Sequence, residues 1–347
     1  MQIAGKRVNA FVLTACLLVA LVCGGAVAYA AGAWWTGGGN ETLTVNAVGD
    51  SYDDAFKEDI ANADVVIDYY KIATAEADET YQKFNYKLTG DFAGQGFDIP
   101  AEADRSAETW QQLADECAAL DAAKLTADGM AAPGTPITSL EDGLYLVMAH
   151  GKGITDSMTA RTETHEYTFQ PTIVALPNLE DNQWVTDVTI SMKPEQDDLY
   201  GDLRIVKRVE GYFGTPATFV FHLKSTEDSP FDYDNYASVE YSGGESAYTD
   251  VRHIKAGTKL TVTEEEGTGF ELVSGDDSVK TIVAKAADAD EDAVPEVTVT
   301  YVNKATGKPA HGIENNYKLV DDGEEGGEWE WHVADDANAE PGPMPTN

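Results

Sequence analysis

Three short stretches of the sequence decide the fold of this chain: Leu203-Arg-Ile-Val-Lys207, Leu260-Thr-Val-Thr-Glu264 and Val299-Thr-Tyr-Val-Asn303. Alternate positions in each stretch are apolar, which is the pattern of a β-strand that buries one face. On that apolar face, each stretch ends with one polar residue: a lysine, a glutamate or an asparagine. The sequence therefore predicts three strands that direct these polar side chains toward one interior.

Burying an unpaired ammonium or carboxylate is costly, so the three groups are expected to meet one another or to change protonation. Desolvation favours a neutral, nucleophilic Lys207 amine and a protonated Glu264. Glu264 can then polarise the Asn303 carboxamide and carry protons while ammonia leaves. We therefore predict an intramolecular Lys207–Asn303 isopeptide bond with Glu264 as its catalyst. The alternative is three unrelated residues at strand ends, where polar side chains reach water.

Further strand patterns, separated by turn residues, extend this region over residues 199–305. Seven short strands in about a hundred residues are typical of an antiparallel immunoglobulin-like sandwich. We expect the strands at residues 203–209, 217–223, 237–241, 259–264, 270–274, 279–284 and 296–303.

A second β-rich domain is predicted at residues 42–198, before a polar break. One helical stretch, residues 106–124, interrupts its strands, because Trp110, Leu113 and Cys117 recur at spacings of three and four. We interpret Cys117 as a small apolar residue on that buried face. The strands are expected at residues 42–48, 65–73, 83–88, 143–149, 167–175 and 184–192.

The first thirty residues have the pattern of a secretory signal peptide. Two basic residues precede an apolar run at 10–22, and Ala28-Tyr-Ala30 predicts cleavage between Ala30 and Ala31, followed by a leader to residue 41. An uncleaved membrane anchor is the alternative. Leu13-Thr-Ala-Cys16 also fits a lipoprotein box, but the apolar run continues well beyond it. Each of these interpretations makes the protein an exported one.

The composition excludes several classes of protein. Among 347 residues, 61 Asp and Glu outnumber 23 Lys and Arg, for a net charge of −38. Such a charge repels phosphate backbones and argues against nucleic acid as a partner. Apolar residues make up 43% of the chain, which is enough for two cores, whereas residues 306–347 have the composition of an acidic, disordered tail. Once the signal peptide is removed, Cys117 remains alone, so no internal disulfide is expected.

Motifs for catalysis and for cofactors are weak. The six histidines are scattered, and none is paired with another His or Cys at the spacing of metal ligands. Residues 288–292 begin like a calcium loop, but Ala293 stands where such a loop needs glycine. We therefore expect no metal, no cofactor and no enzymatic turnover, and an exported hydrolase is a disfavoured alternative.

The three stretches resemble motifs of the collagen-adhesin B-type (CnaB) domains of Gram-positive surface proteins. In that family a Lys, a Glu and an Asn occur in this order and form the crosslink, so the resemblance implies these roles for Lys207, Glu264 and Asn303. The sequence departs from the family after Glu264. It continues Glu-Glu-Gly-Thr-Gly-Phe270, where many pilins carry Ala-Pro and then Gly-Tyr.

Residues 184–193 resemble the pilin motif of sortase-assembled pilins, with Trp184, Val188, Ile190 and Lys193 at its spacing. The resemblance implies that Lys193 attacks a sortase acyl-enzyme that carries a neighbouring subunit. Strand parity agrees, because it turns Met192 toward the core and Lys193 outward. The alternative is an ordinary surface lysine at the end of a strand.

No second crosslink is expected in the first domain. Lys71 is its candidate lysine, but parity turns Thr186 inward and Asp187 outward on the closing strand, which leaves no buried amide or acid acceptor. The C-terminus also lacks the Leu-Pro-x-Thr-Gly signal of a sortase substrate. The chain as written is expected to accept a subunit through Lys193 but not to be transferred itself.

These observations favour an exported, Gram-positive, pilin-like structural protein at the cell surface or in the cell wall. Its fold class is all-β: two tandem immunoglobulin-like (CnaB-type) sandwiches, the first with a helical insertion, followed by a disordered acidic tail. The expected partners are other pilin subunits and a class C-type sortase. The alternative is a secreted or wall-associated adhesin that binds a host or matrix ligand and never polymerises.

Overall fold

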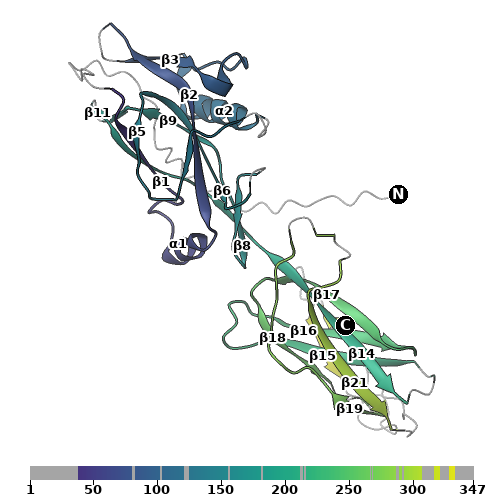
Figure 1. Ribbon diagram of the computed structural model, residues 1–347. Helices are drawn as coiled ribbons and strands as arrows, with labels where there is room; N and C mark the ends of the chain where they lie inside the picture. Colours follow the sequence, from purple (N-terminus) through teal and green to yellow (C-terminus); the bar gives the residue numbers. More distant parts are fainter. Residues whose placement is uncertain are drawn as a thin grey trace, which may run out of the picture. The chain divides into compact units, whose positions relative to one another are not determined.

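The computed structural model contains two compact units (Figure 1). The first comprises residues up to Thr162 and Tyr167–Gln196, and the second comprises Glu163–Glu166 and the chain from Asp197 onward. The predicted signal peptide with its Ala30–Ala31 cleavage site lies outside the described residues. The structure describes residues 38–79, 83–101, 104–120, 125–154, 157–180, 183–211, 214, 216–265, 267, 269–286, 289–290 and 293–306, and the backbone of 316–320 and 328–332.

The first unit is a sandwich of two sheets. Apolar residues from both sheets meet in one core, as Leu43 and Val188 do with Ile67 and Val147. One sheet has the strand order β12 (Asp187–Ser191), β1 (Glu41–Asn46), β5 (Ile137–Leu140). The other has the order β3 (Phe84–Leu88), β2 (Val65–Ala77), β6 (Gly143–Gly151), β9 (Thr172–Leu176), with β4 (Gly129–Ala131) also paired to β2.

Helix α2 (Ala107–Ala118) covers the outer face of the larger sheet. It begins after Ser106, whose hydroxyl accepts a hydrogen bond from the backbone N–H of Thr109. Trp110 and Cys117 are buried against the sheet, which confirms the predicted apolar face, although the helix ends earlier than predicted. A second helix, α1 (Asp54–Ala61), was not expected from the sequence because it buries only Ile60.

Two predicted strands of the first unit are divided in the structure. Residues 167–175 form β8 (His165–Thr168) and β9, with Pro171 between them, since proline offers no N–H to a ladder. Residues 184–192 form β11 (Gln183–Val185) and β12, and the break exposes Thr186, so its predicted inward orientation is wrong. The remaining short elements are η1 (Gly90–Phe92), β7 (Thr159–Arg161), β10 (Asn178–Glu180) and β13 (Glu195–Asp198).

The second unit is a sandwich of two four-stranded sheets whose core includes Leu203, Phe221, Val262 and Tyr301. Its first and last long strands, β14 and β21, are parallel neighbours (Figure 1). One sheet has the order β17 (Ala247–Lys255), β14 (Tyr200–Glu210), β21 (Val297–Ala305), β19 (Phe270–Ser274). The other has the order β16 (Asp234–Tyr241), β15 (Ala217–Ser225), β18 (Lys259–Glu264), β20 (Lys280–Thr281).

The predicted fold class is confirmed: both units are β-sandwiches, and the helical insertion belongs to the first. The structure departs from the prediction in the tail, where β22 (Asn316–Val320) and β23 (Glu328–His332) pair with each other. None of the helices in the described part of the chain is long and apolar enough to span a membrane.

Candidate functional site

The two sheets of the second unit each contribute to a polar cluster in its interior. Lys207 on β14 and Asn303 on β21 belong to one sheet, and Glu264 ends β18 in the facing sheet. In the parallel ladder Lys207 is opposite Tyr301 and Val209 is opposite Asn303. Since alternate residues share a face, Lys207 and Asn303 both point into the sandwich, as strand parity predicts.

Each group of this cluster contacts the other two. The Lys207 Nζ donates hydrogen bonds to Glu264 Oε2 and to Asn303 Oδ1, both at 2.5 Å. The Asn303 Nδ2 donates to Glu264 Oε1 at 2.6 Å. The structure thus brings together all three residues that the sequence singled out for a crosslink, with the amine against the carboxamide and the carboxyl group bridging both.

The cluster is closed to water. Lys207 is 0% exposed and Asn303 4%, and the Glu264 side chain is also 4% exposed. Burial lowers the pKa of the Lys207 amine, and the contact with Glu264 acts in the opposite direction. The neutral form of the amine is therefore easier to reach by loss of a proton here than for a lysine in water.

Aromatic rings form the walls of the cluster. The Lys207 Nζ lies 4.2 Å from the ring centroid of Phe219 and 5.8 Å from that of Phe221, both on β15. Sequence reasoning did not assign these residues to the site. The signal that could have identified them is their alternation within the predicted strand 217–223, which places both rings on the interior face.

Lys71 in the first unit has different surroundings. Its Nζ lies 2.6 Å from Glu141 Oε2, but the Glu141 side chain is 77% exposed, whereas that of Lys71 is 15% exposed. The hydrogen bond and the charge of Lys71 lower the pKa of Glu141. Water solvates the exposed Glu141 carboxylate, so this contact is an ordinary ion pair.

Lys193 is exposed in the segment that follows β12. Both of its neighbours are buried: Met192 donates its backbone N–H to Asn46 O at 2.9 Å, and Pro194 accepts a hydrogen bond from Tyr52 Oη at 3.4 Å. The backbone is therefore held while the lysine side chain faces outward, as the alternation in the sequence predicts.

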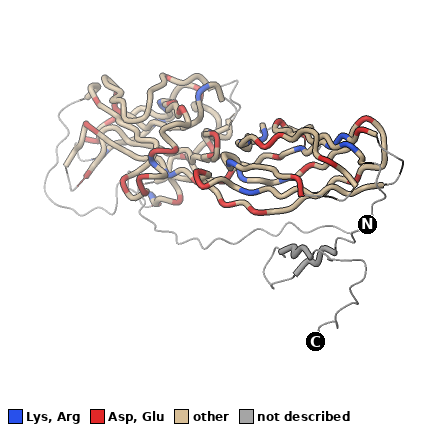
Figure 2. The backbone as a smooth tube through the Cα atoms, turned by 90° about the horizontal axis from the view of Figure 1, so that it is seen from below, with Lys and Arg blue, Asp and Glu red and all other residues tan. Residues whose placement is uncertain are grey.

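Figure 2 shows acidic positions spread over both units and outnumbering the basic ones. Within the part of the chain that the structure describes, no group of three or more His, Cys, Asp or Glu side chains is arranged to hold a metal ion.

No protein-family model and no curated protein match the sequence. Among solved structures, the chain is similar to a C-terminal fragment of the pilus adhesin SpaC from Lactobacillus rhamnosus GG, with 11% identity over 78% of this chain and 98% of that one and a TM-score of 0.25. A streptococcal ancillary pilin matches with 15% identity over 81% and 71% and a TM-score of 0.25. The major pilin SpaA of Corynebacterium diphtheriae matches with 11% identity over 76% and 100% and a TM-score of 0.22.

Proposed function

We propose that this chain is an exported, pilin-like structural protein of a bacterial cell surface, whose second unit is stabilised by an autocatalytic Lys207–Asn303 isopeptide bond. The observation that carries this proposal is the mutual contact of an amine, a carboxyl group and a carboxamide in an interior closed to water. A bond formed once in each molecule is a maturation step, so the proposal includes no enzymatic turnover.

The coupling is a transamidation that the three side chains complete without a cofactor. The Lys207 ammonium passes a proton to Glu264, and the neutral amine attacks the Asn303 carboxamide carbon. Glu264 returns the proton to the departing Nδ2, the bond from that nitrogen to the carbon breaks, and ammonia leaves. The attacking nitrogen then passes its second proton to the released ammonia, which departs as ammonium, and Glu264 ends as the carboxylate with which it began. Much of the rate comes from position, because the folded core holds the reactants in contact.

Intact-mass spectrometry of the purified full chain tests this proposal. The mature chain should weigh about 17 Da less than its sequence, the mass of one ammonia. A tryptic digest should contain a branched peptide that joins Lys207 to Asn303. Glu264→Gln, which keeps the shape of the side chain, should restore the full mass. The matched control is Lys71→Met, which breaks the exposed lysine–glutamate pair and should leave the loss of mass intact. Full mass in the wild-type chain would refute the bond.

We also propose Lys193 as the acceptor lysine for sortase-mediated assembly with other pilin subunits. Its side chain is exposed, and the backbone on both sides of it is held. A lysine presented in this way has an amine within reach of an acyl-enzyme at little cost in ordering the chain.

Co-expression with a class C-type sortase and a pilin that carries a sorting signal tests the assembly. Covalent ladders that resist boiling should form and should be lost in Lys193→Arg. Lys152→Arg, at another exposed position, is the control and should keep them. Ladders that persist in Lys193→Arg would exclude this acceptor. Absence of ladders from the wild-type chain would favour the alternative of a non-polymerising adhesin that binds a host or matrix ligand.

A further inference from the structure

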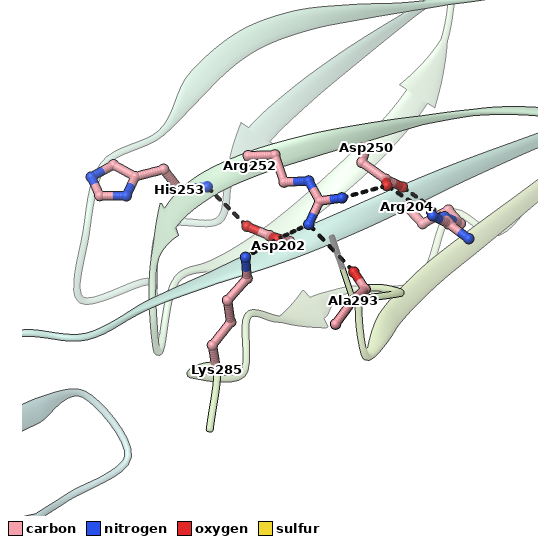
Figure 3. Close-up of polar contacts among 7 residues, drawn as sticks. All are labelled: Asp202, Arg204, Asp250, Arg252, His253, Lys285 and Ala293. Atoms are coloured by element: carbon pink, nitrogen blue, oxygen red, sulfur yellow. Dashed lines mark hydrogen bonds and ion pairs between the residues drawn. The ribbon is translucent and has the colours of Figure 1, made fainter. Parts of the chain in front are cut away.

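A continuous network of charged side chains lies at the start of β14 (Figure 3). The Asp202 Oδ2 accepts hydrogen bonds from Lys285 Nζ at 2.7 Å and from Arg252 Nη1 at 2.6 Å. Arg252 Nη2 also donates to Asp250 Oδ2 at 2.9 Å, and Arg204 binds both oxygens of Asp250 at 2.6 and 2.8 Å. We call these five residues the Asp202 network.

Asp202 is the buried centre of this network. Its side chain is only 3% exposed, and its Oδ1 accepts the backbone N–H of His253 at 3.0 Å. Burial acts to raise the pKa of Asp202, but the hydrogen bonds from Lys285, His253 and Arg252 outweigh it and leave the pKa lowered. Asp202 is therefore a buried anion with three donors, and loss of a donor leaves it under-compensated.

The network contacts described residues at both ends of the connection between β20 and β21, residues 282–296, which we call the crossover. Lys285 anchors it twice, since its backbone N–H also donates to Tyr200 O at 2.9 Å. Near the other end, Ala293 O accepts a hydrogen bond from Arg252 Nη1 at 3.4 Å. The crossover also lies directly on β14: a Cβ atom on Gly201 would be 1.9 Å from Val283 O.

The register of β14 against β21 decides whether Lys207 and Asn303 meet. The two strands are parallel, with Leu203 opposite Val297, so no tight hairpin turn sets their register. In the native register Asn303 is opposite Val209. A shift of one residue would turn Asn303 to the outer face, and a shift of two toward the end of β14 would place it opposite Gly211, farther from Lys207. These shifts would therefore separate the carboxamide from the Lys207 amine.

We propose that Asp202 is a positioning residue for the Lys207–Asn303 coupling. Together with Lys285 and Arg252, it holds the crossover where β21 joins β14, and it thereby sets the register that presents the carboxamide to the amine. The inference rests on the proposed isopeptide bond, because only that reaction gives the register a chemical consequence. The network fixes the start of the strand pair, and the triad joins its far end.

The rate of coupling after synthesis tests the role of Asp202. The full chain is made in a cell-free system, and the loss of mass is followed in time for the fraction that resists protease. Asp202→Asn and Lys285→Met should slow coupling in folded molecules by about tenfold or more, because small misplacements of reacting groups cost large factors in rate. Lys285→Arg should restore much of the rate. Lys259→Met is the control, since it breaks the more exposed Lys259–Asp228 pair of the same unit.

A second measurement reads the register without the reaction, in Lys207→Met chains that cannot couple. The substitutions Arg208→Cys and Val302→Cys place two thiols at outward-facing positions that are opposite each other, so their disulfide reports the native register. Arg208→Cys combined with Thr300→Cys reports the slip of two residues that moves Asn303 away from Lys207, because the separation of these positions in the native register exceeds disulfide geometry. Adding Asp202→Asn should raise the yield of the slipped disulfide.

The two measurements separate this inference from the proposed function. If the wild-type chain never loses ammonia, the isopeptide bond is refuted. If Asp202→Asn nevertheless shifts the register in that case, Asp202 sets the register of the two strands but positions no reaction. The inference would be overturned if Asp202→Asn and Lys285→Met couple at the wild-type rate and if Asp202→Asn produces no slipped disulfide in the cysteine variants.

Discussion

Both units contain a lysine that contacts a glutamate of another strand or turn, and the two contacts have almost the same length. The Nζ–Oε2 distance is 2.6 Å for Lys71 and Glu141 and 2.5 Å for Lys207 and Glu264. Water reaches the first pair through an exposed Glu141, whereas the second pair is closed off and contacts the carboxamide of Asn303. The distance between a lysine and a glutamate therefore does not by itself identify a reactive site. Burial of the pair and contact with an electrophilic group, here the Asn303 carboxamide, distinguish the candidate site from an ordinary ion pair.

The largest effect is expected from removing the acid of the buried site. Glu264→Gln should prevent the crosslink and lower the free energy of unfolding of the second unit by about 4–5 kcal/mol, the loop-entropy value for a closed loop of about 100 residues. Urea or thermal unfolding of the full chain measures it, with Lys71→Met as the control that keeps the second transition. An unchanged second transition in Glu264→Gln would mean that the crosslink adds no stability.

An intermediate effect on stability is expected from a change of pH, because each unit buries a carboxyl group and the two pKa values are shifted in opposite directions. Burial, together with the charge of Asp142 and a hydrogen bond to it, raises the pKa of Glu41 to about 7, while the pKa of Asp202 is lowered. Between pH 4.5 and 7 the folded first unit binds more protons than the unfolded chain, so its stability should fall as the pH rises. The contribution of Asp202 is instead lost as the pH falls through its low pKa.

Thermal unfolding between pH 5 and pH 8 measures this difference. The transition of the first unit should move to lower temperature as the pH rises, and Glu41→Gln should flatten that dependence because it stays neutral. The second transition serves as the internal reference. A wild-type first unit with equal stability at pH 5 and pH 8 would contradict the raised pKa of Glu41.

The smallest effect is expected from breaking the exposed pair. Lys71→Met should change the free energy of unfolding of the first unit by less than about 1 kcal/mol, since water already solvates Glu141. Urea unfolding of the full chain measures the change. A loss of several kcal/mol would show that the two lysine–glutamate contacts are more alike than their burial indicates.

Much of the fold could be predicted where apolar residues alternate without interruption. The bounds of β18 agree with the predicted strand at 259–264, in which Leu260 and Val262 are buried. The bounds of β19 also agree with the prediction, although most of that strand is exposed. Strand β17 was missed because it lies at the edge of its sheet and its sequence does not alternate between apolar and polar residues. It carries Asp250 and Arg252, whose side chains pair with charged residues of the neighbouring strand β14. The hairpin of β22 and β23 was missed because its residues lie in an acidic, glycine-rich context.

The candidate site could be predicted only in part, for a related reason. Lys207, Glu264 and Asn303 lie on regular strands, so parity sufficed to direct them inward. Asp202 escaped the same reasoning because the register of β14 against β17 shifts between Gly201 and Leu203, and both Asp202 and Leu203 are buried. Its partners Arg252 and Lys285 are also far away in sequence, so nothing local connects the three.

The parallel pairing of β14 and β21 has a mechanical consequence. The chain enters the second unit at the start of one strand and leaves β21 at the opposite end of the sheet, so tension between the two ends shears the pair along its length and loads many ladder hydrogen bonds together. A covalent link from Lys207 to Asn303 would carry that tension from the first strand to the last. The strands between them would stay folded under load because the force never passes through them.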